Sequence, residues 1–263
     1  MFAAFRRWRR RRILARGAPD PAVWRQTLAR LPFLAGLNAD EEARLRDTVI
    51  LFLHGKSIHG AAGLELDPDM RLLIAVQACV LILNLDIDYY DGWVEVIVYP
   101  DEFVPKIEYT DEAGVVHTDF APRAGEAWLQ GPVILSWADV APRADGDGVN
   151  VVIHEFAHKL DMLNGDANGF PPLQAGMSRR AWAAAFEAAY ADFCRRVDAD
   201  EETAIDPYAA ESPAEFFAVV SEAFFEMPQA VQADYPAVYE QLRQFYKQDP
   251  ARRLALHADP RIG

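Results

Sequence analysis

The chain has 263 residues, of which 51% are hydrophobic and 11% aromatic, so it can bury a substantial core and is not expected to be disordered. Its formal net charge of −14 is unevenly distributed. Residues 1–16 carry seven arginines and no acidic residue, so the remaining residues carry −21, the total of −14 less these seven positive charges. An acidic body of this kind argues against general nucleic-acid binding.

Cysteine usage and hydropathy indicate a cytoplasmic protein. Cys79 and Cys194 both lie in apolar segments that predict helices, so we expect reduced core residues. The longest apolar run, 72–85, is shorter than the ~20 residues that a membrane-spanning helix needs, and it contains Gln77 and Asn84. The apolar stretch after the first arginines is too short for the core of a secretory signal. We therefore expect no transmembrane segment.

The arginine-rich start stands apart from the rest of the sequence. Residues 1–20 predict a basic tail or short helix, ahead of a single domain over residues 21–263 that shows no repeat and no clean linker. The arginines could contact an acidic surface, a membrane or a nucleic acid. A solvated tail, or one folded back on the acidic body, is the simpler interpretation.

In the N-terminal half, the hydrophobic pattern predicts helices separated by short strands. Asn38 and Glu41 have the spacing of a capping box, so a helix is expected to begin after Asn38 and to reach about residue 53. Asp67 and Pro68 begin a second, almost wholly apolar helix to about residue 83, which predicts a central place in the core. A shorter helix is expected at 21–31. Strands are expected at 93–99, 105–109, 115–119 and 133–137, the middle two joined by a turn at 111–114.

The C-terminal half predicts mainly helices. Ser178 and Ser212 are N-cap residues for helices that should reach about residue 197 and stop before Pro228, and Pro213 suits the first helical position. A last helix is expected at 228–246. These elements predict an α+β fold, mostly helical, with a small mixed sheet. An extended peptide can pair with an open sheet edge, and we expect 133–137 to be that edge.

The most informative stretch is His154-Glu155-Phe156-Ala157-His158. Residues four apart share one face of an α-helix, so both imidazoles can reach one zinc ion at about 2.0–2.1 Å. Glu155 lies beside them and can take a proton from a water that the metal activates. The alternative is a buried helix whose histidines bond to backbone carbonyls, but such a helix would strand several polar groups.

A catalytic zinc needs a third protein ligand. The candidates are acidic residues further along the chain, namely Glu215, Glu222, Asp206 and Glu211. Glu215 and Glu222 are seven residues apart and share a face of the same predicted helix. Glu215 also completes a capping pattern with Ser212, so its carboxylate could instead bond the backbone of that serine. Spacing alone leaves these alternatives open.

Two carboxylates are candidates for accepting a hydrogen bond from the imidazole nitrogen that does not bind the metal. Asp161 lies three residues after His158 and seven after His154, so it shares their face. A carboxylate there can accept a hydrogen bond from an imidazole N–H, or it can cap a neighbouring helix. Glu222 is the second candidate for such a supporting role if it is not itself the third ligand.

Together these motifs resemble those of the Mlc titration factor A family of zinc peptidases. The resemblance rests on His154-Glu-Phe-Ala-His158-Lys-Leu-Asp161 and on the segment from Asp206-Pro-Tyr208 to Glu215-Phe-Phe-Ala. The helix at 73–79 and the strand at 96–100 also look like that family, so the resemblance covers about residues 20–250. The same motifs are similar, more distantly, to the catalytic domain of anthrax lethal factor, in which a zinc-binding glutamate follows an active-site tyrosine by seven residues.

The resemblance implies a zincin-like fold, with the small mixed sheet beside the metal-binding helix. It implies that His154, His158 and Glu215 bind one Zn2+, that Glu155 is the general base, and that Tyr208 is the active-site tyrosine. It also implies a cytoplasmic, aminopeptidase-type enzyme acting on small peptide substrates. The arginine-rich start does not match the family pattern.

The resemblance implies a protein partner as well. The member that gives the family its name binds the transcriptional repressor Mlc, so this chain is expected to bind a similar regulator in addition to its peptide substrate. The alternative function is chiefly regulatory, in which the chain sequesters an Mlc-like repressor and peptidase activity is secondary. No direct contact with nucleic acid is expected.

Overall fold

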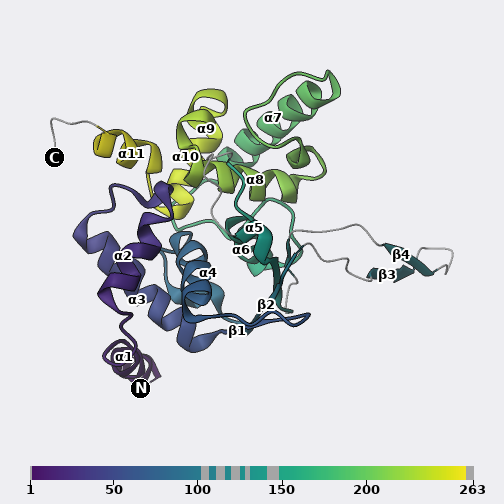
Figure 1. Cartoon of the computed structure of the whole chain (residues 1–263). Coiled ribbons are helices and arrows are strands. Elements are labelled where there is room, and N and C mark those ends of the chain that lie inside the picture. The colour runs from purple at the N-terminus through teal and green to yellow at the C-terminus, as the bar shows by residue number, and fades with distance from the viewer. Residues whose placement is uncertain are drawn as a thin grey trace.

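The computed structural model describes residues 2–101, 131–140 and 148–258, together with the backbone of three short strands at 107–110, 116–119 and 125–127. Helices dominate this part of the chain, as predicted (Figure 1). The helices are α1 (Phe2–Leu14), α2 (Pro21–Ala29), α3 (Ala39–Gly55), α4 (Pro68–Val80), α5 (Trp137–Val140), α6 (Val151–Asp161), α7 (Arg179–Asp198), α8 (Pro213–Glu226), α9 (Pro228–Asp234), α10 (Pro236–Tyr246) and α11 (Pro250–Ala258). The strands are β1 (Ser57–Gly60), β2 (Glu95–Tyr99), β3 (Ile107–Thr110), β4 (Val116–Asp119), β5 (Gly125–Ala127) and β6 (Val133–Ser136).

Four of these strands form a small sheet in the order β1-β2-β6-β5. The first three are parallel, with Ile58 opposite Val96 and Val96 opposite Val133, whereas β5 runs antiparallel to β6. The prediction that 133–137 forms the open edge is therefore wrong, because β6 has a partner on both sides. Its nearly continuous burial is typical of an inner strand, which an apolar run alone does not distinguish from a strand at the edge.

The strands predicted at 105–109 and 115–119 are confirmed as an antiparallel pair, β3 and β4, with Ile107 opposite Asp119. The turn expected at 111–114 lies outside the described residues.

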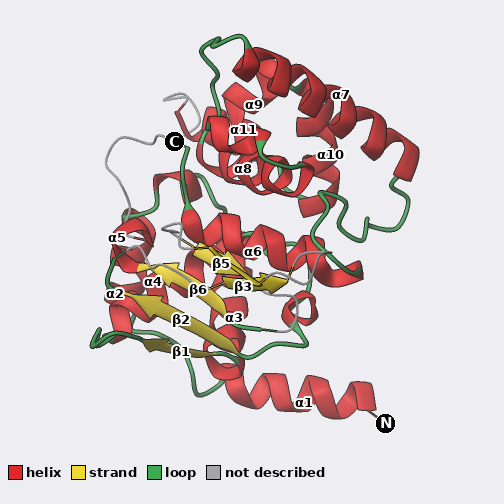
Figure 2. Ribbon diagram, turned by 90° about the vertical axis from the view of Figure 1, so that its right-hand side faces the viewer, coloured by secondary structure: helices red, strands yellow, loops and turns green. Residues whose placement is uncertain are grey.

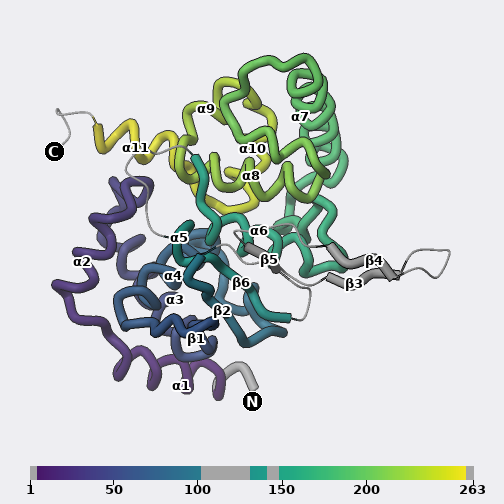
Figure 3. The backbone as a smooth tube through the Cα atoms, turned by 45° about the vertical axis from the view of Figure 1, so that its right-hand side comes forward, coloured from purple at the N-terminus to yellow at the C-terminus, as the bar shows by residue number. Residues whose placement is uncertain are grey.

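Helix α6 lies at the centre of the molecule. It packs against β5 and β6 on one side and against α8 on the other, as Figure 2 shows. Helices α1 to α4 lie on the side of the sheet, and α7 to α11 gather on the side of α8 (Figures 1 and 3). Nearly every residue of α6 is buried, so the helix that carries the histidine motif is held from both sides.

Aromatic side chains fix α6 to the first half of the chain. Phe156 of α6 is fully buried, and its ring centroid lies 5.7 Å from that of Phe52, 5.2 Å from Tyr90 and 5.6 Å from Trp93. Most of these rings meet edge to face, the arrangement that aromatic pairs favour. Tyr90 also donates its hydroxyl to the carbonyl of Ala78 in α4, so the predicted central helix and α6 share one core.

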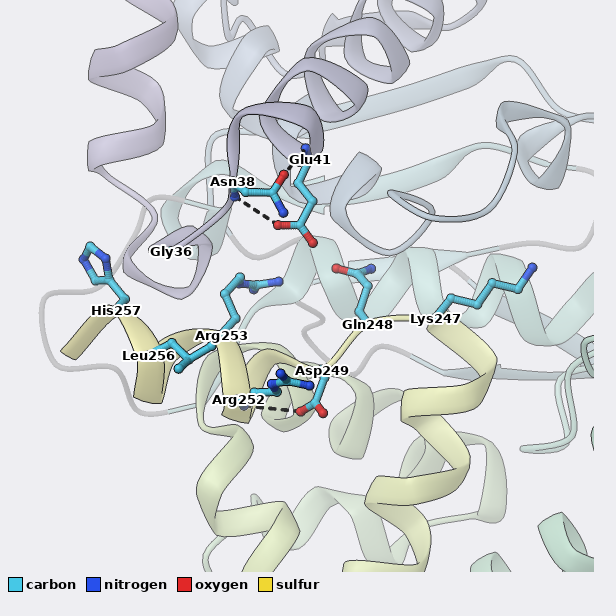
Figure 4. A pocket seen from close by; sticks show the side chains of 10 residues that line it. All are labelled: Gly36, Asn38, Glu41, Lys247, Gln248, Asp249, Arg252, Arg253, Leu256 and His257. Atoms are coloured by element: carbon cyan, nitrogen blue, oxygen red, sulfur yellow. Dashed lines mark hydrogen bonds between the residues drawn. The ribbon is translucent and has the colours of Figure 1, made fainter. Parts of the chain in front are cut away.

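The capping box predicted for the start of α3 is confirmed. Asn38 accepts from the backbone of Glu41, and the Glu41 carboxylate accepts from the backbone N–H of Asn38, each at 3.0 Å. Figure 4 shows this box at the rim of a cavity of about 530 Å³ between the start of α3 and α11. Arg253 of α11 closes one side by donating to the carbonyl of Phe33 at 2.8 Å.

The prediction of one helix at 228–246 is wrong, because Pro236 divides it into α9 and α10. Proline lacks the N–H that a helix interior needs and disfavours helical backbone at the preceding residue, and Tyr235 accordingly leaves the helical region with φ −130° and ψ 60°. Helix α11, an amphipathic helix of nine residues that begins at Pro250, was not predicted.

The basic start forms helix α1, and two of its arginines pair with acidic residues of the body. Arg10 lies 3.1 Å from Asp86 and also contacts Asp88, and Arg6 lies 3.4 Å from Asp88. The helix packs along α3. Among the described residues, no helix has both the length and the apolar character needed to cross a bilayer.

The loop after α6 is shaped by Gly169, which has φ +75°. Its N–H donates to Asp161 at the end of α6, and its carbonyl accepts from Trp182 of α7. A Cβ at this position would lie 2.4 Å from the carbonyl oxygen of Pro213, the first residue of α8. The glycine therefore permits a close approach of three helices around the histidine motif.

We predict that Gly169→Ala lowers the free energy of unfolding more than Gly176→Ala does. Gly176 also has a positive φ of 90°, but open space surrounds its Cβ position, so it controls for backbone strain alone. Crowding against Pro213 should add roughly 1–3 kcal/mol, the usual cost of overpacking. Urea denaturation of both variants measures the difference. Equal losses would show that the approach of α8 does not depend on this glycine.

Candidate metal centre

His154 and His158 come together because they lie one helical turn apart on α6. Their ring centroids are 4.8 Å apart, and the two Nε2 atoms are 3.2 Å apart. Both side chains are about nine-tenths buried. Two ring nitrogens that face one another at this distance in a buried position need a cation or a proton between them.

Glu215 brings a carboxylate to the same point from α8. Ser212 caps this helix by accepting from the backbone N–H of Glu215 at 3.1 Å, and Pro213 occupies the first helical position, as predicted. The Glu215 carboxylate turns towards the histidines, with Oε2 at 3.0 Å from His154 Nε2 and 3.3 Å from His158 Nε2. The carboxylate is therefore not occupied only with the backbone of Ser212, which was the alternative left open by the capping pattern.

These three donor atoms have the spacing that a tetrahedral metal ion requires. Their separations of 3.0, 3.2 and 3.3 Å agree with the roughly 3.3 Å expected between neighbouring ligands that each lie about 2.05 Å from a zinc ion. Within the described part of the chain, this is the one group of three or more acidic, histidine or cysteine side chains that meets the distance requirement for holding a metal. The other candidates, Asp206 and Glu211, are exposed and lie outside it.

Glu222, two turns along α8 from Glu215, contacts the other nitrogen of His154. Its Oε1 lies 2.7 Å from His154 Nδ1, and its Oε2 accepts from the backbone N–H of Asn150 at 2.5 Å. An Nδ1–H donated to this carboxylate fixes the ring and leaves the lone pair of Nε2 free for a metal. Glu222 therefore lies where a supporting partner of a histidine ligand would lie.

Asn150 was not among the residues predicted for this site. Its side-chain oxygen caps α6 by accepting from Ile153 N–H at 3.0 Å, and its amide donates to Gln77 of α4 and to Glu226 of α8, each at 2.8 Å. One buried asparagine thus ties the start of the histidine helix to two other helices. An asparagine directly before an apolar helical run is a recognisable N-cap signal, but its tertiary partners cannot be read from the sequence.

Asp161 has a different place from Glu222. Its Oδ2 accepts from the backbone N–H groups of Asn168 and Gly169 at 2.7 and 2.6 Å, so it organises the loop that follows α6. Its Oδ1 and the Nδ1 of His158 are both buried, and neither makes a hydrogen bond within the described part of the structure. Of the two predicted supporting carboxylates, the structure thus brings only Glu222 into hydrogen-bond contact with an imidazole.

Glu155 is buried next to the histidines, with 4% of its surface exposed. Its Oε2 makes no hydrogen bond within the described residues. Burial raises the pKa of Glu155 to about 7, against the opposing influence of His154 and His158. A carboxylate poised in this way has the properties of a general base, and a cation at the neighbouring donors would lower its pKa.

The charges around the histidines favour a cation. Burial lowers the pKa of His154, but Glu222 and Glu215 outweigh this effect and hold it well above its usual value. Burial raises the pKa of Glu215, yet its hydrogen bonds to both histidines hold it below its usual range. Burial also raises the pKa of Glu222. Several carboxylates thus surround two imidazoles in a desolvated place, which suits a bound metal ion.

Tyr208 lies at the exposed rim of the same centre. It belongs to a single 3-10 turn, Pro207–Ala210, that Asp206 begins by accepting from the backbone N–H of Tyr208 at 2.8 Å. The Tyr208 ring centroid is 6.1 Å from that of His154, and 44% of the residue is exposed. The structure thus places Tyr208 beside the metal donors rather than in the core.

The chain is similar in sequence to a known family and to named relatives. Residues 5–247 match the family described as glucose-regulated metallo-peptidase M90. The chain belongs to this family. It is 42% identical over 241 residues to the Mlc titration factor A of Salmonella paratyphi A, which covers 90% of this chain and 89% of that protein. It is 40% identical over 239 residues to the Mlc titration factor A of Escherichia fergusonii, with 90% of each chain covered.

Membership of this family confirms the resemblance found in the sequence, and it implies a bound metal ion. The geometry of the donors fits that implication, because two imidazole nitrogens and one carboxylate oxygen converge from two helices that are buried against each other.

We predict that Glu222→Ala weakens zinc binding by about 10–100-fold, the usual effect of removing the partner of a histidine ligand. Glu226→Ala is the matched control, because Glu226 lies on the same helix and its carboxylate accepts a hydrogen bond from Asn150 but, within the described part of the chain, makes none to the histidines. It should leave the affinity within about threefold. Competition with a chromophoric zinc chelator measures both variants. Wild-type affinity in Glu222→Ala would exclude the supporting role.

Proposed function

We propose that the chain is a zinc-dependent peptidase with a zincin-like arrangement of sheet and metal helix. The observation that carries the proposal is the convergence of His154, His158 and Glu215 on one point, with Glu155 buried beside them. Membership of a metallopeptidase family supports the class of reaction. Zinc is the ion that this donor set suits, because two imidazoles and one carboxylate with an open fourth position are typical of catalytic zinc sites.

Each residue then has a separate role. His154, His158 and Glu215 hold the ion, and Glu222 orients the His154 ring. When bound, zinc supplies Lewis acidity, which polarises the scissile carbonyl and lowers the pKa of a water molecule.

Glu155 accepts the proton of the attacking water and delivers it to the leaving amine. Tyr208 at the rim donates a hydrogen bond to the oxyanion that develops on the carbonyl.

The resemblance to the Mlc titration factor A family supports aminopeptidase-type activity on small substrates and a place in the cytoplasm. The charges at the rim agree with the first of these. Asp206 and Glu211 are exposed on either side of the turn that carries Tyr208, so the rim offers negative charge to a protonated amino terminus. A panel of aminoacyl 4-nitroanilides, with and without an N-acetyl block, tests this. Faster cleavage of the blocked substrates would contradict the aminopeptidase assignment.

We predict that Glu155→Gln lowers kcat by at least 10²–10⁴-fold, the range typical of a lost general base, while zinc content stays unchanged. The variant removes the proton acceptor but keeps the size of the side chain. Glu187→Gln, on the exposed face of α7, is the control and should retain full activity. Steady-state kinetics and elemental analysis on the same samples test whether Glu155 is the general base. Near wild-type turnover in Glu155→Gln would exclude that role.

For Tyr208→Phe we predict a fall in kcat of about 10-fold or more with little change in KM, because the hydrogen bond forms only as the oxyanion develops. The ring, its contact with His154 and its exposure remain, so the fold should be unaffected. The thermal unfolding midpoint checks the fold. An unchanged kcat would place the tyrosine outside the mechanism.

We also propose binding to a transcriptional regulator resembling Mlc. The support is the name of the relatives, which describes a factor that titrates Mlc. A pull-down of such a regulator by the wild type and by Glu215→Ala separates the two functions. If Glu215→Ala still binds the regulator, the chain has a scaffold role that is independent of the peptidase. If Glu215→Ala loses binding, the regulator contacts or depends on the metal centre.

A further inference from the structure

We propose that α1 is a docking element that lays its outward face on an anionic lipid surface. The inference is independent of the peptidase function, because α1 lies at the opposite end of the fold from α7 to α11 (Figures 1 and 2). It rests on an exposed aromatic pair, a fixed orientation of the helix and arginines that form no ion pair within the described residues.

The aromatic pair is formed by Phe5 and Trp8, which are 60% and 49% exposed. They lie three residues apart on one face of α1, and their rings stack with centroids 5.7 Å apart. Tyr208 is the one other aromatic side chain among the exposed large hydrophobic residues of the described structure, and it lies at the metal centre. An exposed Phe–Trp pair flanked by arginines has the residue types that insert at the boundary between lipid headgroups and acyl chains.

Contacts on the other side of α1 fix which face points outward. Arg10 pairs with Asp86 and Asp88, and Ile13 is half buried near α3. At about 100° per residue, Arg10 lies about 200° and Ile13 about 140° round the helix from Trp8. About half of Trp8 is therefore exposed on the side away from Asp86 and Asp88, while the rest of it lines a cavity with Ile50 and Leu53 of α3. Just beyond the helix, a Cβ on Gly17 would meet Ile50 of α3 at 2.6 Å, so the end of the segment is also held close to the body.

The charge of the helix suits an anionic partner. Within the described part of the chain, Arg7, Arg9, Arg11 and Arg16 form no ion pair, although the protein as a whole carries −14. Flanking arginines around an apolar pair combine the two attractions that hold a helix at a membrane surface, burial of apolar area and attraction to anionic lipid headgroups.

The aromatic pair favours lipid over nucleic acid. Single-stranded nucleic acid is bound by stacking bases on open aromatic faces. Here the Arg12 guanidinium covers the Trp8 ring at 4.8 Å from its centroid, and Phe5 stacks against the same residue. Rings occupied in this way can still insert beside lipid headgroups, whereas they offer little to a base.

Co-sedimentation of the full chain with vesicles tests the proposal. The probes are phosphatidylcholine vesicles with and without 30% phosphatidylglycerol, a composition on the order of that of anionic membrane leaflets. We expect binding to the anionic vesicles alone, at least tenfold weaker at high salt because screening shortens the reach of the arginines. Phe5→Ser combined with Trp8→Ser, and separately Arg7→Ser combined with Arg11→Ser, should each weaken it at least tenfold.

Matched controls distinguish binding through this surface from nonspecific adsorption to vesicles. Leu256→Ser removes another exposed apolar side chain, and Arg180→Ser removes another exposed arginine, on helices α11 and α7 at the opposite end of the fold from α1. Both should bind vesicles as the wild type does. Absence of binding to anionic vesicles, or equal binding by the Phe5/Trp8 variant, would overturn the proposal. So would binding to a nucleic acid that depends on the arginines but not on the aromatic pair, in an anisotropy assay at the same salt.

Discussion

The structure depends on the contact between His154 and two glutamates of one helix. Glu215 lies at one ring nitrogen and Glu222 at the other, and the two residues are two turns apart on the same face of α8. A buried imidazole between two carboxylates demands that α6 and α8 pack in one register, because a shift of either helix would leave charged groups buried without partners. The position of the candidate metal centre thus follows from the packing of two helices rather than from a flexible loop.

Several surrounding contacts stabilise the register of α6 against α8. Asn150 caps α6 and bonds Glu222 through its backbone, while Ser212 caps α8 and orients the turn that carries Glu215. Gly169 lets the loop after α6 pass close to the start of α8. On the far side, Phe156 fixes α6 among the aromatic rings of the first half of the chain. Donors held by buried, capped helices are preorganised, which limits the reorganisation needed when a metal binds.

The sequence predicted the local features well because each depends on neighbours along the chain. The capping box at Asn38, the start of α8 at Ser212 and the spacing of His154 and His158 all follow from short-range rules, and the structure agrees with them. The break at Pro236 was also readable in principle, since proline seldom continues a helix, but the apolar periodicity on both sides of it concealed the boundary. Pairing between distant strands was not readable. The apolar pattern of 133–137 fits an edge strand or an inner one, and only the structure shows partners on both sides.

For the candidate centre, spacing placed the two histidines on one face but left four acidic residues open as the third donor. The choice among them is a matter of tertiary packing, because Glu215 and Glu222 share a face and both approach His154. The family resemblance indicated Glu215, and the structure brings that carboxylate to both Nε2 atoms. Asn150 remained hidden, because a helix cap gives no sign in the sequence that it also bonds residues more than seventy positions away.

The most direct measurement is the metal content of the purified protein, determined by elemental analysis for the wild type, Glu215→Ala and Glu211→Ala side by side. Glu211 is exposed and four residues from Glu215, so its variant controls for the loss of a nearby carboxylate. The account predicts about one zinc per chain in the wild type and in Glu211→Ala, and a large loss in Glu215→Ala. Zinc retained in Glu215→Ala, or none in the wild type after zinc is supplied, would contradict a centre built from His154, His158 and Glu215.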